Sequence, residues 1–152
     1  MEKQDMQIRI AQNTDLAGIL QLYAQPNMDD GLILPLPEAE AILARMQRYP
    51  NYHVFVAQDG GAIVGSFALL VMDNLAHRGT PSAIVEDVVV APDRQGQGIG
   101  KKMMAYAITR AKAAGCYKLM LSSNAKREAA HHFYESLGFV RHGYSFRIDL
   151  VN

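Results

Sequence analysis

The sequence predicts one mixed α/β domain, and three observations lead to that prediction. Apolar residues alternate with polar ones in some segments, as in half-buried strands, and recur every three or four residues in others, as in helices. These segments interleave in the order βααβββαβαβ, without an internal repeat or a linker. The length of 152 residues is typical of one domain. We therefore expect a single domain over residues 1–152.

The first third of the chain predicts a short strand and two helices. Ile8 and Ile10 alternate with polar neighbours, which is typical of a strand. Apolar residues then recur at helical spacing over residues 16–23. A second helical pattern runs from residue 38 to residue 48, and Pro50 stops it because proline cannot continue a helix.

Three strands should follow. Residues 52–58 and 62–72 are rich in β-branched and aromatic side chains, and Asp59-Gly60-Gly61 separates them. Because Asp-Gly readily adopts the positive φ angles of a tight turn, we expect these strands to form a hairpin. Residues 83–90 (AIVEDVVV) show almost no alternation, which predicts a central strand covered on both faces.

The last third predicts a helix, a strand, a second helix and a terminal pair of strands. Apolar residues follow helical spacing over 98–114, and the next residue is a glycine, which favours the end of a helix. A buried strand is expected over 117–121 and a helix over 127–137. Residues 139–150 predict two strands or a hairpin.

Composition excludes several classes of protein. Lys+Arg and Asp+Glu number 15 each, so no net charge recruits nucleic acid or an anionic membrane. The longest apolar stretch, residues 61–72, is too short to span a bilayer. Cys116 is the single cysteine and cannot form an intramolecular disulfide, which favours a cytoplasmic protein. Adjacent His131 and His132 would point about 100° apart on a helix, so we expect no metal site.

A glycine-rich turn after the central strand predicts a site for a phosphate-bearing ligand. Gly96, Gly98 and Gly100 let the backbone approach a ligand closely and turn successive N–H groups toward one concavity. The helix that begins there adds the positive end of its dipole. Arg94 and Lys101 add side-chain charge.

Two common phosphate-binding motifs do not fit this turn. A nucleotide P-loop places Ser or Thr after its Gly-Lys pair, whereas Lys101 is followed by Lys102. A dinucleotide fingerprint has the spacing GxGxxG at the first turn of a repeated βαβ unit. This turn reads GQGIG and comes late, after an antiparallel meander. Taken alone, the glycine pattern also fits a tight turn without a ligand.

The residues of the turn resemble a known family. Gln95-Gly96-Gln97-Gly98-Ile99-Gly100 matches the Q/R-x-x-G-x-G/A signature of the GNAT superfamily of N-acetyltransferases, and the resemblance continues through Ile8-Arg9-Ile10-Ala11 and residues 130–139. It implies the GNAT fold: one mixed, mostly antiparallel sheet of about six or seven strands flanked by about four helices. It also implies a splay between the parallel strands 83–90 and 117–121, and acetyl-CoA as cosubstrate.

The resemblance also implies which residues hold acetyl-CoA. The backbone of residues 88–90 would pair with the pantetheine arm, and the loop amides of residues 95–101 would hold the pyrophosphate. Many family members carry Asn where Arg127 stands, so this position departs from the pattern. The expected set is Val88, Val89, Val90, Gln95, Gly96, Gln97, Gly98, Ile99, Gly100, Lys101, Asn124, Arg127 and Phe133.

Acetyl transfer to an amine needs a base for the amine and an acid for the departing thiolate. The family commonly uses a tyrosine of the last helix as the acid, a role that Tyr134 would fill, because a phenol is still protonated at neutral pH. Glu86, in the central strand, is the candidate base, acting through water. Because strand side chains alternate, Asp87 should face the opposite side from Glu86, and we expect it to contact the substrate. Whether Glu86, Asp87 or water is the base stays open.

The acceptor is expected to be a primary amine on a small molecule. Two narrower resemblances compete: residues 85–87 and 115–118 look like glucosamine-6-phosphate N-acetyltransferases, and residues 121–134 look like aminoalkylphosphonate N-acetyltransferases. Both families act on amines that carry an anionic group. Asp149 stands where the sugar-phosphate family has an arginine. The candidate clamps for the anion are His77, Arg78, Arg141 and Arg147.

Other functional interpretations of the sequence remain. The chain also fits a protein or peptide N-acetyltransferase, or an acyl-CoA-binding module without catalytic activity. The intact Glu86 and Tyr134 favour an enzyme over the module. Both narrower resemblances imply a homodimer.

Overall fold

The structure, a computed structural model, describes residues 6–26 and 28–151. It divides into two units, Met1–Met120 and Leu121–Asn152. The first unit contains a five-stranded sheet in the order β1-β2-β3-β4-β5. Neighbouring strands pair antiparallel except β4 and β5, which are parallel. The strands are β1 (Gln7–Ile10), β2 (Tyr52–Asp59), β3 (Ala62–Met72), β4 (Ser82–Val90) and β5 (Leu119–Met120).

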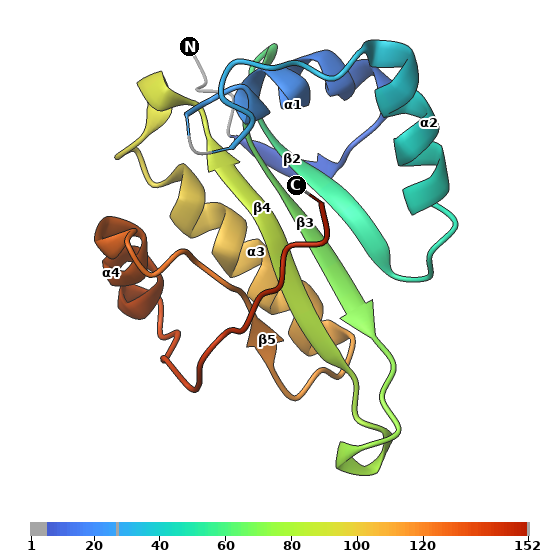
Figure 1. Ribbon diagram of the computed structural model, residues 1–152, viewed down its shortest axis with the longest axis vertical. Coiled ribbons are helices and arrows are strands. Elements are labelled where there is room, and N and C mark those ends of the chain that lie inside the picture. Colours follow the sequence, from blue (N-terminus) through green and yellow to red (C-terminus); the bar gives the residue numbers. More distant parts are fainter. Residues whose placement is uncertain (1–5, 27, 152) are drawn as a thin grey trace. The chain divides into compact units, whose positions relative to one another are not determined.

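Helices of the first unit cover both faces of this sheet. Helices α1 (Leu16–Tyr23) and α2 (Leu36–Met46) pack on the face formed by residues such as Val54, Val56 and Ala68. Helix α3 (Ile99–Ala113) covers the other face (Figure 1). There the stacked rings of Phe55 and Phe67 lie 5.1 Å apart, and the ring of Tyr106 lies 5.5 Å from Phe55. Helix α4 (Glu128–Ser136) belongs to the second unit.

A close approach between β3 and α3 favours glycine at one strand position. A Cβ added at Gly65 would lie 2.8 Å from the Sδ atom of Met103, a residue with no exposed surface. Any side chain at this position would force the helix away from the sheet or Met103 out of its rotamer. The glycine therefore sets how closely α3, which follows the glycine-rich turn, lies against the strands.

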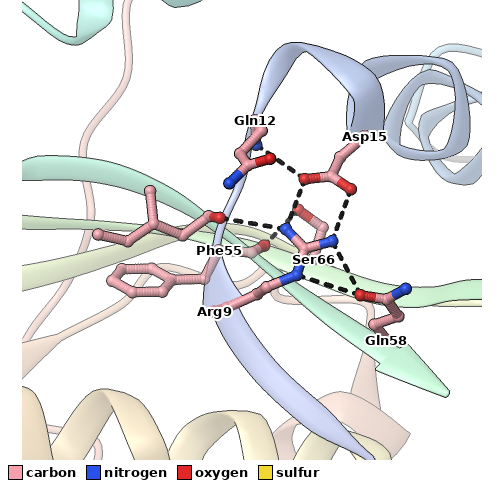
Figure 2. Close-up of polar contacts among 7 residues, drawn as sticks. Arg9, Gln12, Asp15, Phe55, Gln58 and Ser66 are labelled. Carbon is pink, nitrogen blue, oxygen red and sulfur yellow. Dashed lines mark hydrogen bonds and ion pairs between the residues drawn. The ribbon is translucent and has the colours of Figure 1, made fainter. Parts of the chain in front are cut away.

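A polar cluster joins β1, β2 and the start of α1. The Arg9 guanidinium donates to both Asp15 carboxylate oxygens, at 2.7 and 2.8 Å, and to the Gln58 Oε1 atom (Figure 2). The backbone N–H of Gln12 donates to the same Asp15 carboxylate at 2.7 Å. Asp15 is buried, and its charge is balanced in this way. The hydrogen bond from Arg9 holds the pKa of Asp15 below its ordinary value.

Helices α1–α4 confirm the predicted helices, and β2, β3 and the turn between them confirm the predicted hairpin. The predicted strand over residues 117–121 is shorter than expected, at Leu119–Met120. Strands β4 and β5 pair only at Ala83–Leu119 and Ile84–Met120. Within the first unit, the six residues of β4 that follow therefore have no parallel neighbour in β5, which fits the expected splay.

The predicted strands over residues 139–150 are wrong, and over the residues that the structure describes the sheet has five strands rather than six or seven. The alternation of apolar and polar residues is real, but a strand forms only where a neighbouring backbone supplies hydrogen bonds. In the described part of this segment, the apolar side chains instead lie open: Phe146 is 92% exposed and Ile148 is 82% exposed.

Candidate functional site

The glycine-rich turn forms the uncapped start of α3. Gly96 and Gly98 have φ angles of 81° and 82°, in the left-handed region that glycine adopts without strain. Gly98 is the N-cap residue, and no described side chain caps the helix. A Cβ added at either glycine would meet no atom within 4 Å, so the space before the turn is open. The first-turn amides of this 15-residue helix therefore face a space suited to an anion.

Charged side chains around the turn divide into two groups. Lys101 and Lys102, on the first turn of α3, are exposed and can reach an anion. Arg94 lies before the turn, but its guanidinium donates to the Asp59 carboxylate at 2.7 Å. This ion pair ties the turn to the end of β2. Arg94 therefore stabilises the position of the turn.

Strand β4 is irregular where it approaches the turn. Ser66 pairs with Val89 and Ala68 with Glu86, so the register shifts between them and Phe67 faces two residues, Asp87 and Val88. Asp87 has a φ of 54°, which is rare for a residue with a side chain. Such a bulge interrupts the ladder of hydrogen bonds and leaves backbone groups open. It lies directly before residues 88–90, the stretch predicted to bind the pantetheine arm.

The bulge changes how the two carboxylates of β4 lie. The expectation that Glu86 and Asp87 face opposite sides rested on regular alternation, which does not hold here. Both residues are exposed, and the charges of both raise the pKa of Tyr52, whose own burial is the largest cause. Protein atoms around the Asp87 carboxyl raise its pKa, and the negative charge of Asp29 raises it further.

Tyr23, the last residue of α1, and Asp29, in the connection that follows, interact electrostatically with Asp87, and the sequence did not indicate them. Burial raises the pKa of Tyr23 to about 12, and the charges of Asp87 and Asp29 add to the shift. Gln25 donates from Nε2 to the backbone oxygen of Val90 at 3.1 Å. In the sequence, Tyr23 is indistinguishable from an apolar helix position, and Asp29 from any loop aspartate. Only the fold brings them to β4.

The basic residues His77 and Arg78 lie before the start of β4, whereas the glycine-rich turn follows its end. His77, Arg78 and Gly79 have φ angles of 51°, 59° and 75°, a left-handed run in an exposed loop. The His77 ring lies 4.4 Å from the ring of Tyr117. The structure therefore places these two candidate clamps at the opposite end of β4 from the turn.

In the second unit, Tyr134 lies among aromatic side chains. Its ring lies 5.1 Å from Phe133 and 5.8 Å from Phe139. Burial raises the pKa of the Tyr134 phenol, and the positive charge of Arg127 lowers it. The phenol therefore carries its proton at neutral pH, as an acid must before it donates.

Asn124 organises the start of α4. Its Oδ1 atom accepts from the Lys126 N–H at 2.9 Å, and its backbone oxygen accepts from the Arg127 N–H at 3.0 Å. His131 contacts the same backbone oxygen at 2.8 Å. These contacts show that Asn124 stabilises the turn before α4. The roles of Asn124 and Arg127 in holding acetyl-CoA stay predictions.

The remaining candidate clamps, Arg141 and Arg147, form ion pairs inside the second unit. Arg141 contacts Glu135 at 2.7 Å and Arg147 contacts Asp149 at 2.9 Å. The Arg147 side chain is 81% exposed, so this pair contributes little to stability and can exchange for another anion.

Among the described residues, no three His, Cys, Asp or Glu side chains are grouped in a way that could hold a metal ion. Over the same part of the chain, the helices are too short or too polar to cross a bilayer.

The sequence matches an acetyltransferase family model and individual N-acetyltransferases. Residues 14–139 match a family model described as the acetyltransferase (GNAT) family. A glucosamine 6-phosphate N-acetyltransferase of Trypanosoma brucei brucei is 34% identical over 149 residues, covering 96% of this chain and 97% of that protein. An aminoalkylphosphonate N-acetyltransferase of Salmonella typhimurium is 35% identical over 97 residues, which cover 64% of this chain and 62% of that protein.

A solved structure agrees with these matches. A putative acetyltransferase from Agrobacterium tumefaciens superposes with a TM-score of 0.88 at 38% identity, covering 94% of this chain and 99% of the other.

Proposed function

The chain belongs to the acetyltransferase (GNAT) family, and we propose that it is an acetyl-CoA-dependent N-acetyltransferase. In this proposal it transfers the acetyl group to a primary amine of a small metabolite, by direct attack in a ternary complex. The observation that carries the proposal is the uncapped start of α3, which follows the bulged end of a strand bearing two carboxylates.

The glycine-rich turn fits the pyrophosphate of acetyl-CoA. The open space at Gly96 and Gly98 admits an anion close to the backbone, and the helix dipole and Lys101 favour its negative charge. The open backbone of β4 before this turn fits the amide groups of a pantetheine arm, held by Val88, Val89 and Val90. Asn124, Arg127 and Phe133 of the second unit complete the proposed set. Bound acetyl-CoA supplies an activated acetyl thioester.

The proposed proton transfers use Glu86 and Tyr134. Glu86 accepts a proton from the acceptor amine through water, which leaves the nitrogen lone pair free to form the new C–N bond. Tyr134 donates its phenolic proton to the sulfur as the C–S bond breaks. Burial keeps this phenol protonated until that point, which supports the assignment.

The proposed acceptor carries an anionic group. The named activities of the two relatives, on glucosamine 6-phosphate and on aminoalkylphosphonates, support this choice. His77, Arg78 and Arg147 are the residues proposed to contact the anion, with Asp87 near the amine. We further propose that the protein acts in the cytoplasm as a homodimer, a state that light scattering on the purified protein measures.

The experiment that tests the proposal follows thiol release from acetyl-CoA in the presence of glucosamine 6-phosphate, aminoalkylphosphonates, polyamines, amino acids and short peptides. We expect turnover with at least one small amine, and faster turnover with glucosamine 6-phosphate than with glucosamine if an anion is recognised. Turnover on peptides alone would favour a protein N-acetyltransferase. Binding of acetyl-CoA without any turnover would favour a binding module, and no binding would refute the proposal.

A further inference from the structure

We propose that Gln25 is a positioning residue of the acetyl-CoA site: its side chain occupies the backbone carbonyl of Val90, so that the pantetheine arm takes its carbonyl acceptor at Val88. This inference rests on the proposed acetyltransferase function. It adds to the site a residue from the connection after α1, and it gives the arm one defined register on β4.

The backbone groups of Val90 point away from β3, toward the side of β4 on which β5 lies. The Ala91 N–H donates to the backbone oxygen of Val64 at 2.8 Å, so this pair of residues carries a hydrogen bond between the two segments. Hydrogen-bonded and non-hydrogen-bonded pairs alternate in an antiparallel ladder, and Val90 and Gly65 form the adjacent pair. Val90 therefore presents its N–H and C=O groups to the opposite edge of β4.

The same edge of β4 is open at Val88. Alternation along the strand turns the backbone groups of Val88 to the same side as those of Val90, and the register of the described strands gives Val88 no partner in β3. Within the described part of the first unit, β5 pairs with β4 at Ala83 and Ile84, well before both valines. Such an edge repeats its N–H and C=O groups every two residues, about 6.8 Å, so by itself it does not specify which of them a ligand uses.

Two side chains occupy the carbonyl of Val90. Gln25 donates to it from Nε2 at 3.1 Å, and Gln95 donates to it from Nε2 at 3.4 Å. A backbone carbonyl oxygen has two lone pairs, so these two donors fill its capacity. An amide N–H of the pantetheine arm is therefore accommodated at the Val88 carbonyl, while the Val90 N–H stays available as a donor to the arm.

Gln25 is the better-fixed donor of the two. Its hydrogen bond is the shorter one and its side chain is half-buried, whereas Gln95 is exposed. The Gly31 N–H donates to the backbone oxygen of Ala24 at 2.8 Å, and the Met28 N–H donates to that of Gln25 at 3.2 Å. These bonds hold the backbone around Gln25 to the end of α1, which is itself packed on the sheet. The side chain therefore reaches β4 from a fixed starting point.

Loss of the Gln25 amide would change where the arm binds. It would free a lone pair on the Val90 carbonyl and so offer the arm a second acceptor, two residues nearer the glycine-rich turn. The arm would then divide between two registers, and in one of them its thioester end would stop about 6.8 Å short along β4. Because small displacements of reacting groups lower reaction rates strongly, kcat should fall more than affinity does.

The first test reads the two carbonyls directly and needs no turnover. In ¹³C-labelled wild-type protein, coenzyme A should move the carbonyl resonance of Val88 downfield, the direction of a new hydrogen bond, and leave that of Val90 unchanged. Shifts of the amides of residues 95–101 together with equal movement of both carbonyls would overturn this inference alone. No shift at the turn or at either carbonyl would overturn the proposed function, and the inference with it.

Gln25→Met is the matched variant, because methionine has a similar length, no charge and no N–H donor. In the free variant the Val90 carbonyl resonance should move upfield, and coenzyme A should then move the resonances of both Val88 and Val90 downfield. Gln21→Met makes the same change at an exposed position of α1 and should behave as the wild type. A Val90 resonance unchanged between the free wild type and free Gln25→Met would overturn the inference.

Kinetics separate positioning from a merely structural role. With the amine that gives the fastest thiol release, Gln25→Met should lower kcat roughly tenfold, as expected for a displaced thioester. The Kd for coenzyme A should change less than about threefold, because no donor to the ligand is lost. Gln25→Lys, which restores an N–H donor, should recover most of the lost kcat. Equal losses of kcat in Gln25→Met and Gln25→Lys, or no loss in Gln25→Met, would contradict the assignment.

Discussion

Asp87 holds a backbone conformation that aspartate rarely adopts, with a φ of 54° in the middle of a strand. Left-handed conformations cost a residue with a side chain about 1–2 kcal/mol. Strain of this kind persists where the surrounding structure enforces it, and it recurs at functional sites. Here the pairing of β3 and β4 on both sides of the bulge enforces it.

Replacing Asp87 should therefore separate stability from activity. We expect Asp87→Gly to raise the free energy of unfolding by about 1 kcal/mol, because glycine adopts positive φ without strain. The same variant should lower kcat/KM for the amine, because a carboxylate is lost. Asp87→Asn, which tolerates the left-handed region, should lose activity without the gain in stability. Urea unfolding and thiol release measure the two quantities; a destabilised Asp87→Gly would contradict the account of strain.

Arg9 and Asp15 offer a second test at the residue scale. Because Asp15 has a pKa below its ordinary value in the folded protein, its contribution to stability is complete at neutral pH and is lost as the pH falls through that lowered pKa. Asp15→Asn should cost about 2 kcal/mol at pH 7. The difference in the free energy of unfolding between Asp15→Asn and the wild type should become smaller at acidic pH.

The exposed pair Arg147–Asp149 provides the control for that measurement. Asp149→Asn should change the free energy of unfolding by less than about 0.5 kcal/mol, because exposed ion pairs are screened by water. If Asp15→Asn also changed the free energy of unfolding by less than about 0.5 kcal/mol at pH 7, the polar cluster in Figure 2 would not stabilise the fold as described.

Tyr134 is the residue on which the proposed acid step depends. Tyr134→Phe keeps the ring contacts with Phe133 and Phe139 and removes only the hydroxyl. We expect kcat to fall about 100-fold, the typical contribution of a general acid, while the Kd for acetyl-CoA changes less than about twofold. Tyr144→Phe removes an exposed hydroxyl from the same unit and should change neither. Undiminished turnover in Tyr134→Phe would remove its assignment as the acid.

At the scale of an element, the start of α3 is the most informative part of the molecule. Gly98→Ala places a Cβ in the open space before the helix, where the pyrophosphate would lie, and should weaken acetyl-CoA binding roughly tenfold. Gly60, in the β2–β3 turn, also has a positive φ and open space at its Cβ. Gly60→Ala should therefore cost similar stability without changing the Kd. Calorimetric titration would contradict the assigned site if both variants bound equally well.

The elements also show what a sequence can predict about this fold. The helices and the β2–β3 hairpin follow from periodicity and turn residues, because those signals are local. The bulge at Asp87 was not predicted, because the run of Val, Glu and Asp around it contains no Gly or Pro to mark a break in the strand. The segment 139–150 shows the reverse case: alternation predicts a strand, but pairing depends on a partner that alternation does not specify.

At the scale of the whole molecule, the single thiol of the chain is a poor nucleophile for a covalent acetyl-enzyme. Cys116 is the single thiol, and burial raises its pKa, so it carries little thiolate. We therefore expect initial-rate lines that intersect, as in a ternary complex, when the amine is varied at several acetyl-CoA concentrations. Cys116→Ala should keep turnover within about twofold. Parallel lines would indicate a covalent intermediate and would contradict direct attack.

The sequence predicts only part of the candidate site, because only some of its residues lie close together in the sequence. The glycine-rich turn and residues 88–90 lie close together in the sequence, so the sequence alone is enough to recognise their motif. Gln25, in the connection after α1, reaches the end of β4 only through the fold, where its side chain donates to the backbone oxygen of Val90. Its place at the site depends on a contact between distant segments, which no local pattern records.

The central claim is that this chain forms an amide from acetyl-CoA and an amine. The most direct measurement incubates the protein with acetyl-CoA labelled with ¹³C at the carbonyl carbon, together with the acceptor that gives the fastest thiol release, and identifies the product by NMR. The account predicts that the label appears in an N-acetyl amide on the acceptor. Label recovered only as free acetate, or left in the thioester, would contradict it.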